Sequence, residues 1–268
     1  MQPDVSGISA YFARIGYSGP RAPSLGLLRE LHARHPARIA FECLDPFLGR
    51  LVSLDPEAIT DKLVGSRRGG YCHEHNGLFY DVLAQLGFRV TAHGGRVLWM
   101  DPARDAPLTH RLTLVDLPEG RFVADVGFGG QSATAPLLLE PGLVQPTSHG
   151  TYRVMCTGEN FEVQMELPDR WAPMYRFRLD VQSPIDFVVA NWYTSTHPRS
   201  RFTQNLIASR VVGDMRVNLH NKEFSVRQAD GRTTDRALAG ADDLERVLHD
   251  IFDIVPPVPV ATIWQKML

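Results

Sequence analysis

Residues 68–87 read RGGYCHEHNGLFYDVLAQLG, which joins a glycine-rich turn to an amphipathic helix. From Leu78 onward, apolar residues fall at i, i+1, i+4, i+5 and i+8, and Gly87 stands where helices commonly end. The two glycines near the start allow the backbone to turn tightly just before the helix. The pattern therefore predicts a helix over about 72–86, with Cys72 in its first turn.

This position suits Cys72 as a nucleophile. The unpaired N–H groups and the positive end of the helix dipole favour an anion there, and the thiolate is the nucleophilic form of cysteine. Arg67 and Arg68 either add to the positive field or pair with a carboxylate such as Glu42. The chain has three widely spaced cysteines, which do not form a disulfide framework, so we expect one reactive thiol.

His110 and Asp125 are the candidate base and its orienting acid. A cysteine nucleophile usually needs both partners. His110 lies on one predicted strand and Asp125 on the next, after a short turn. If Asp116 pairs with Arg121 in this hairpin, His110 and Asp125 lie diagonally on one face, within reach of each other. A slip of one residue would put them on opposite faces.

The chain changes character along its length. Helical patterns occupy the first third, over 22–35, near Pro56 and over 72–86, and a last helix is predicted over 242–253. The predicted strands span 88–100, 109–117, 121–126, 151–157, 160–167, 173–181, 206–212, 215–220 and 223–229. Residues 184–205 are interpreted as a connector. This order favours an α+β fold with a barrel or strongly curved sheet at its centre.

The composition of the chain and the motifs that it lacks argue against several classes of protein. Lys and Arg total 28 against 30 Asp and Glu, a net charge of −2, so no basic excess offers nucleic acid a footprint. No run of about 18 apolar residues could span a membrane. The N-terminus lacks the order of a signal peptide, so we expect the cytoplasm. No GxGxxG or Walker A motif points to a nucleotide cofactor.

His73 and His75 lie within three residues of Cys72 and have two interpretations. They are either solvated helix positions or half of a metal site, since Cys72 and His75 share a face at i, i+3. A zinc site needs four ligands, and no second pair of ligands is evident in the sequence. We therefore predict no metal.

The quoted residues resemble a known family. Arg68–Asn76 matches the signature R-G-G-x-C-x-E-x-N of the arylamine N-acetyltransferases, Thr109–Leu112 matches the family's histidine strand, and Asp125–Gly129 matches its aspartate segment. The resemblance implies a papain-like triad of Cys72, His110 and Asp125. It implies a helical bundle over 1–88, a β-barrel over 89–191, a connector over 192–205 and an α/β lid over 206–268.

The resemblance also implies an activity. The expected reaction is acetyl transfer from acetyl-CoA, a co-substrate rather than a permanently bound cofactor, to an arylamine, arylhydrazine or hydrazide. By local context the substrate-binding residues are Phe41, Val97, Phe128 and Phe202, and ordinary core packing is the alternative. Gly127, Gly129 and Gly130 are candidates for contact with CoA, and a plain tight turn is the alternative. Cys43 departs from the family, which usually has Asn there.

Three rival functions remain open at this point. A Cys-His-Asp order also serves transglutaminase-like hydrolases, in which water resolves the thioester. An amide synthase of a biosynthetic pathway would need no CoA. The third rival is a binding protein with an inactive triad. Separately, the chain could form a homo-oligomer. The expected role in xenobiotic metabolism rests on the resemblance alone.

Overall fold

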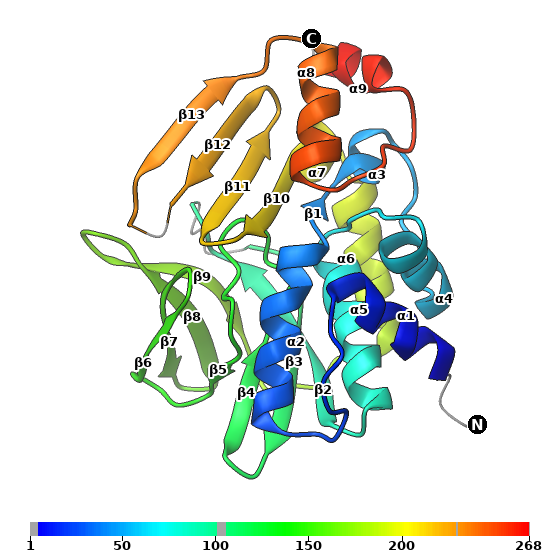
Figure 1. Ribbon diagram of the computed structural model, residues 1–268. Helices are drawn as coiled ribbons and strands as arrows, with labels where there is room; N and C mark the ends of the chain where they lie inside the picture. Colours follow the sequence, from blue (N-terminus) through cyan, green and yellow to red (C-terminus); the bar gives the residue numbers. More distant parts are fainter. Residues whose placement is uncertain (1–4, 101–105, 229, 268) are drawn as a thin grey trace.

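The computed structural model describes residues 5–100, 106–228 and 230–267 (Figure 1). The helices are α1 (Val5–Ile15), α2 (Leu25–Arg38), α3 (Leu44–Phe47), α4 (Pro56–Thr60), α5 (Cys72–Gln85), α6 (Pro184–Thr196), α7 (Arg201–Gln204), α8 (Ala241–Arg246) and α9 (Val260–Lys266), with π-helical turns η1 (Asp61–Gly65) and η2 (Val247–Ile251). The strands are β1 (Phe41–Glu42), β2 (Arg89–Val97), β3 (Leu108–Leu117), β4 (Gly120–Ala124), β5 (Leu137–Leu138), β6 (Val144–Thr147), β7 (Gly150–Thr157), β8 (Asn160–Glu166), β9 (Trp171–Phe177), β10 (Ile207–Val212), β11 (Met215–His220), β12 (Glu223–Arg227) and β13 (Thr233–Ala237).

An eight-stranded antiparallel sheet forms a nearly closed barrel. Its order is β5-β4-β3-β2-β9-β8-β7-β6. The two edge strands are joined through one side chain, because the Gln145 amide on β6 accepts from the Leu138 N–H of β5 at 2.7 Å and donates to the Leu138 carbonyl at 3.0 Å. The predicted α+β class with a central barrel is thus confirmed.

A second sheet lies above the barrel in the view of Figure 1. Its order is β1-β10-β11-β12-β13. Helices α8 and α9 cover one of its faces, where Leu244, Leu248 and Ile263 are buried against strand residues such as Leu219. Strand β1 comes from the N-terminal region and pairs with β10, with Phe41 opposite Ser209. The helical region and the C-terminal sheet are therefore joined by hydrogen bonds.

Helix α5 joins the helical layer to the barrel. Its buried face, including Phe79 and Leu83, shares a core with α1, α2 and the barrel residues Val115 and Phe122. It begins at Cys72, as predicted, and Glu74 caps its N-terminus by accepting from the Tyr71 N–H at 3.1 Å. These contacts fix the first turn of α5 against the barrel.

The predicted hairpin register is confirmed. Asp116 lies opposite Arg121, and Thr113 lies opposite Ala124. An ion pair between Arg121 Nε and Asp116 Oδ1 at 2.6 Å supports this pairing at the turn. Asp125 follows the last residue of β4, so the register brings it toward His110.

The connector prediction over 184–205 is wrong, because this segment forms α6 and α7. Ser183 and Asp186 cap α6, and Pro184 stands at its first helical position. The β-branched residues Val188 and Val189 obscure the helical signal. The division into domains at 88, 191 and 205 stays our proposal.

The predicted and the observed secondary structure also differ at shorter elements. The sequence prediction missed the elements α1, β1, α3, β5, β6, β13 and α9, and the predicted helix over 242–253 is divided between α8 and η2. Among the described residues, no helix has both the length and the apolar character to cross a membrane.

Candidate active site

Cys72 lies at the N-terminus of a helix and lines a large cleft. It is the first residue of α5, and the residue is 6% exposed. The cleft has a volume of about 520 Å³, and both Cys72 and His110 line it. The Cys72 thiol also lies 3.7 Å from the Thr109 carbonyl on β3. The candidate nucleophile is thus packed against the strand that carries His110.

His110 and Asp125 form a buried ion pair. His110 Nε2 lies 2.7 Å from Asp125 Oδ2, and both residues are buried. Burial alone would lower the pKa of His110, but the charge of Asp125, their hydrogen bond and the neighbouring Cys72 together raise it to about 10. Burial would raise the pKa of Asp125, and His110, Asn76 and the Gly127 N–H together lower it. The pair favours an imidazolium beside a carboxylate.

Asn76 holds this pair in place, a role that the sequence reasoning missed. Its Nδ2 donates to Asp125 Oδ1 at 2.7 Å and to the Arg111 carbonyl at 2.5 Å, and its Oδ1 accepts from the Val126 N–H at 3.0 Å. Asn76 is four residues after Cys72, on the same face of α5. That spacing was the available signal.

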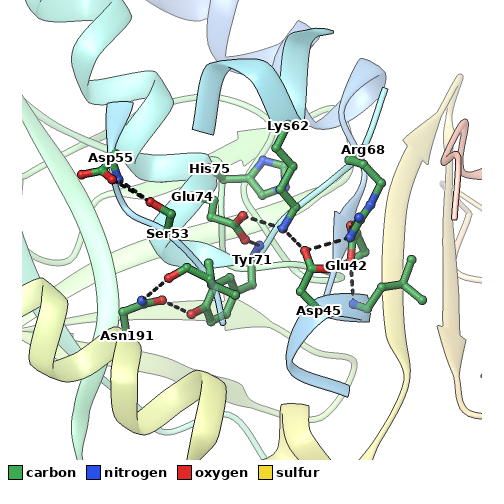
Figure 2. A network of polar contacts seen from close by, with 12 residues as sticks. Glu42, Asp45, Ser53, Asp55, Lys62, Arg68, Tyr71, Glu74, His75 and Asn191 are labelled. Atoms are coloured by element: carbon green, nitrogen blue, oxygen red, sulfur yellow. Dashed lines mark hydrogen bonds and ion pairs between the residues drawn. The ribbon is translucent and has the colours of Figure 1, made fainter. Parts of the chain in front are cut away.

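A buried ion network braces the turn before α5 (Figure 2). Arg68 pairs with Glu42 at 2.7 Å and with Asp45 at 3.0 Å. Lys62 pairs with Asp45 and with Glu74, both at 2.6 Å. Arg68 therefore pairs with Glu42, one of the two alternatives from the sequence, and Arg67 is exposed and pairs with Asp253. The network fixes the cap of the helix that carries Cys72.

Comparison with known proteins gives the family of this chain. Residues 24–258 match the family model described as N-acetyltransferase. The arylamine N-acetyltransferase of Mycobacterium tuberculosis (strain ATCC 25618 / H37Rv) is 45% identical over 253 residues, 92% of this chain and 89% of that protein. The chain belongs to the arylamine N-acetyltransferase family.

Solved structures of arylamine N-acetyltransferases share the fold. The enzyme from Salmonella typhimurium superposes with a TM-score of 0.94 at 36% identity, covering 98% of both chains. The Mycobacterium marinum enzyme, solved in complex with CoA, superposes with a TM-score of 0.90 at 40% identity over 97% of this chain and 96% of that one.

The four aromatic and aliphatic residues expected from the arylamine N-acetyltransferase resemblance line one cleft. Phe41, Val97, Phe128 and Phe202 all border the cleft that contains Cys72. The Phe128 ring meets the His110 ring edge-on, with 5.4 Å between their centroids. The ring centroids of Phe41 and Phe202 are 5.9 Å apart. The structure places them around the candidate nucleophile, and their contact with substrate stays a prediction.

The glycine run also borders this cleft. Gly127, Gly129 and Gly130 line it. A Cβ atom at Gly127 would come within 3.0 Å of the Cys72 Cα, so this glycine permits close packing of the loop on α5. Gly127 therefore has a packing role, and contact with CoA stays a prediction for all three glycines.

The sequence reasoning missed the polar residues of the cleft. Among them are Gln131, Arg199, Arg201, Asn218 and His220. They come from the loop after β4, from α7 and its preceding turn, and from β11, which are far apart in sequence. Only the three-dimensional fold brings them together.

His73 and His75 are fully buried, so the interpretation as solvated positions is wrong. His75 Nδ1 lies 2.8 Å from His35 Nε2, and burial lowers the pKa of His75 to about 4. Burial also lowers the pKa of His73, to about 3. Within residues 5–100, 106–228 and 230–267, no group of three or more His, Cys, Asp or Glu side chains could hold a metal.

Cys43 does not line the cleft, and its thiol contacts the backbone at the start of β10. Its Sγ lies 3.2 Å from the Asn205 carbonyl, and it accepts from the Ile207 N–H at the same distance. Burial raises the pKa of its thiol. The departure from the family at this position is thus a buried packing residue.

Proposed function

We propose that this protein acetylates arylamines, arylhydrazines or hydrazides with acetyl-CoA, through an acetyl thioester on Cys72. The observation that carries the proposal is the placement of Cys72 at the start of α5, beside the His110–Asp125 pair, on the wall of a cleft of about 520 Å³. Cys72 is the proposed nucleophile, His110 the proton carrier and Asp125 the residue that orients it.

The first half-reaction transfers acetyl to the enzyme. His110 holds the proton of the Cys72 thiol, and the thiolate attacks the thioester carbonyl of acetyl-CoA. The bond between that carbon and the CoA sulfur breaks, and His110 gives its proton to the leaving sulfur. CoA departs as a thiol, and the acetyl group stays on Cys72.

The second half-reaction transfers acetyl to the acceptor. The amine nitrogen attacks the acetyl carbon on Cys72, and the now neutral His110 takes a proton from that nitrogen. The carbon–sulfur bond breaks, and the thiolate–imidazolium pair is restored. Asp125 holds the imidazole ring in one orientation and stabilises its charged form in both halves.

The lining of the cleft supports both co-substrates. Phe41, Phe128 and Phe202 provide apolar faces for an aromatic acceptor. Arg199 and Arg201 supply positive charge for the phosphates of CoA, and we propose that Gly127, Gly129 and Gly130 let the backbone approach it. The CoA complex of the Mycobacterium marinum relative supports acetyl-CoA as the donor.

Steady-state kinetics with both substrates varied test the proposal. We expect parallel double-reciprocal lines, because CoA leaves before the acceptor reacts. Intersecting lines would contradict the acetyl-enzyme route, since they require both substrates to be bound together. Amide formation without CoA would instead support an amide synthase, and peptide or amide hydrolysis would support the hydrolase alternative.

A further inference from the structure

A second cleft lies apart from the one that contains Cys72. Its volume is about 680 Å³, and residues of α4, α5, β2, β3 and α6 line it. Among the described residues, none lines both clefts. Its walls are mostly apolar, with Val52, Ile59, Val90, Phe187 and Val188 among them.

The two clefts lie on opposite faces of β3. Successive side chains of a strand point to opposite faces. His110 borders the cleft of Cys72, and its neighbour Arg111 borders the second cleft. Strand β3 thus supplies a charged side chain to each of the two clefts.

Arg111 has no carboxylate within ion-pair distance among the described residues. Its guanidinium lies 4.7 Å from the centroid of the Phe187 ring and 5.7 Å from that of Tyr80. Its Nε is buried and has no hydrogen-bond partner among the described residues, and within the same part of the chain its side chain forms no ion pair. Burial lowers the pKa of Arg111, and Asp81 counteracts this only in part. An unpaired charge in such a place favours an incoming anion.

The residues that line the second cleft limit the class of ligand that it could bind. A planar guanidinium matches a carboxylate in size and geometry, and it can bind both oxygens. The apolar and aromatic walls suit a hydrocarbon or aromatic body. Asp55 and Asp81 also line the cleft, and their negative charges disfavour a second negative group on the ligand. We propose that this cleft binds a small monocarboxylate with an apolar body, held by Arg111.

Calorimetric titration with 3-phenylpropionate tests the proposal, with the uncharged 3-phenylpropanamide as matched probe. We expect saturable binding of one carboxylate per chain, and binding of the amide at least about tenfold weaker, because charged hydrogen bonds contribute more than neutral ones. Absence of saturable binding up to about 10 mM carboxylate, or equal binding of the amide, would overturn the proposal.

Two adjacent residues of α6 locate the binding site. Val188 lines the second cleft and is 48% exposed, whereas Val189 is 63% exposed and does not line it. Val188→Trp should fill the cleft and weaken binding at least about tenfold, and Val189→Trp should change it by less than about twofold. Arg111→Gln should weaken it about tenfold or more. Unchanged binding in Val188→Trp would place the carboxylate elsewhere and refute the assignment.

Discussion

Replacement of Asp125 by Asn is expected to slow acetyl transfer by about 10³ to 10⁴-fold. Asp125 Oδ2 accepts from His110 Nε2 at 2.7 Å, and an amide nitrogen placed there would donate instead. The imidazole would then carry its proton on the other ring nitrogen, and it would lose the charge that stabilises the imidazolium. The single-turnover rate of CoA release from acetyl-CoA measures the effect.

The pH profile separates this role from a general loss of structure. In the wild type the pKa of His110 is raised to about 10, so the imidazolium persists at neutral pH and the rate should fall as the pH rises through about 10. Without the Asp125 charge, burial should lower the pKa of His110, and the decline should move to lower pH. An unchanged profile with a near-normal rate would mean that another residue orients His110.

Asp116→Asn is the matched control for this substitution. Asp116 lies on the same hairpin and forms a partly exposed ion pair with Arg121 at the turn. Its loss should change the rate of acetyl transfer by less than about twofold, because exposed ion pairs contribute little. A large effect there would show that the hairpin itself, rather than the carboxylate beside His110, limits the reaction.

Replacement of Arg68 by Met is expected to lower the free energy of unfolding by about 3 to 5 kcal/mol. The Arg68 side chain is 9% exposed, and that of its partner Glu42 is fully buried. Removal of the guanidinium leaves Glu42 without its cation and Asp45 with only Lys62 (Figure 2). Urea unfolding followed by circular dichroism measures the loss.

An exposed ion pair provides the comparison. Arg178 pairs with Glu159 and Asp180, and all three side chains are at least half exposed. Arg178→Met should cost no more than about 1 kcal/mol. Equal and small losses for Arg68→Met and Arg178→Met would contradict the view that the buried network supports the start of α5.

Local signals allowed much of the site to be predicted. The glycine pair, the helical spacing and the terminal glycine placed Cys72 at the start of α5, and these signals lie within twenty residues of one another. The register of the β3–β4 hairpin followed from its short turn, and it brought His110 and Asp125 together. This hairpin argument selected His110 among ten histidines, and the motifs of the family match the same residue.

Long-range contacts explain what could not be predicted. Asn76 bonds to groups 35 and 49 residues away, so its spacing alone did not reveal its partners. The polar side of the Cys72 cleft combines residues from three distant segments. Helix α6 was missed because its exposed, β-branched residues carry no clear amphipathic pattern, and the second cleft that it borders was therefore invisible in the sequence.

The central claim is the acetyl thioester on Cys72, and mass spectrometry of the intact protein tests it most directly. The wild type, Cys72→Ala and Cys156→Ala are each mixed with acetyl-CoA without acceptor; Cys156 is a partly exposed thiol and serves as the control. The wild type and Cys156→Ala should gain the mass of one acetyl group and lose it when an arylamine is added, and Cys72→Ala should gain none. An unmodified wild type, or an adduct that persists in Cys72→Ala, would contradict the account.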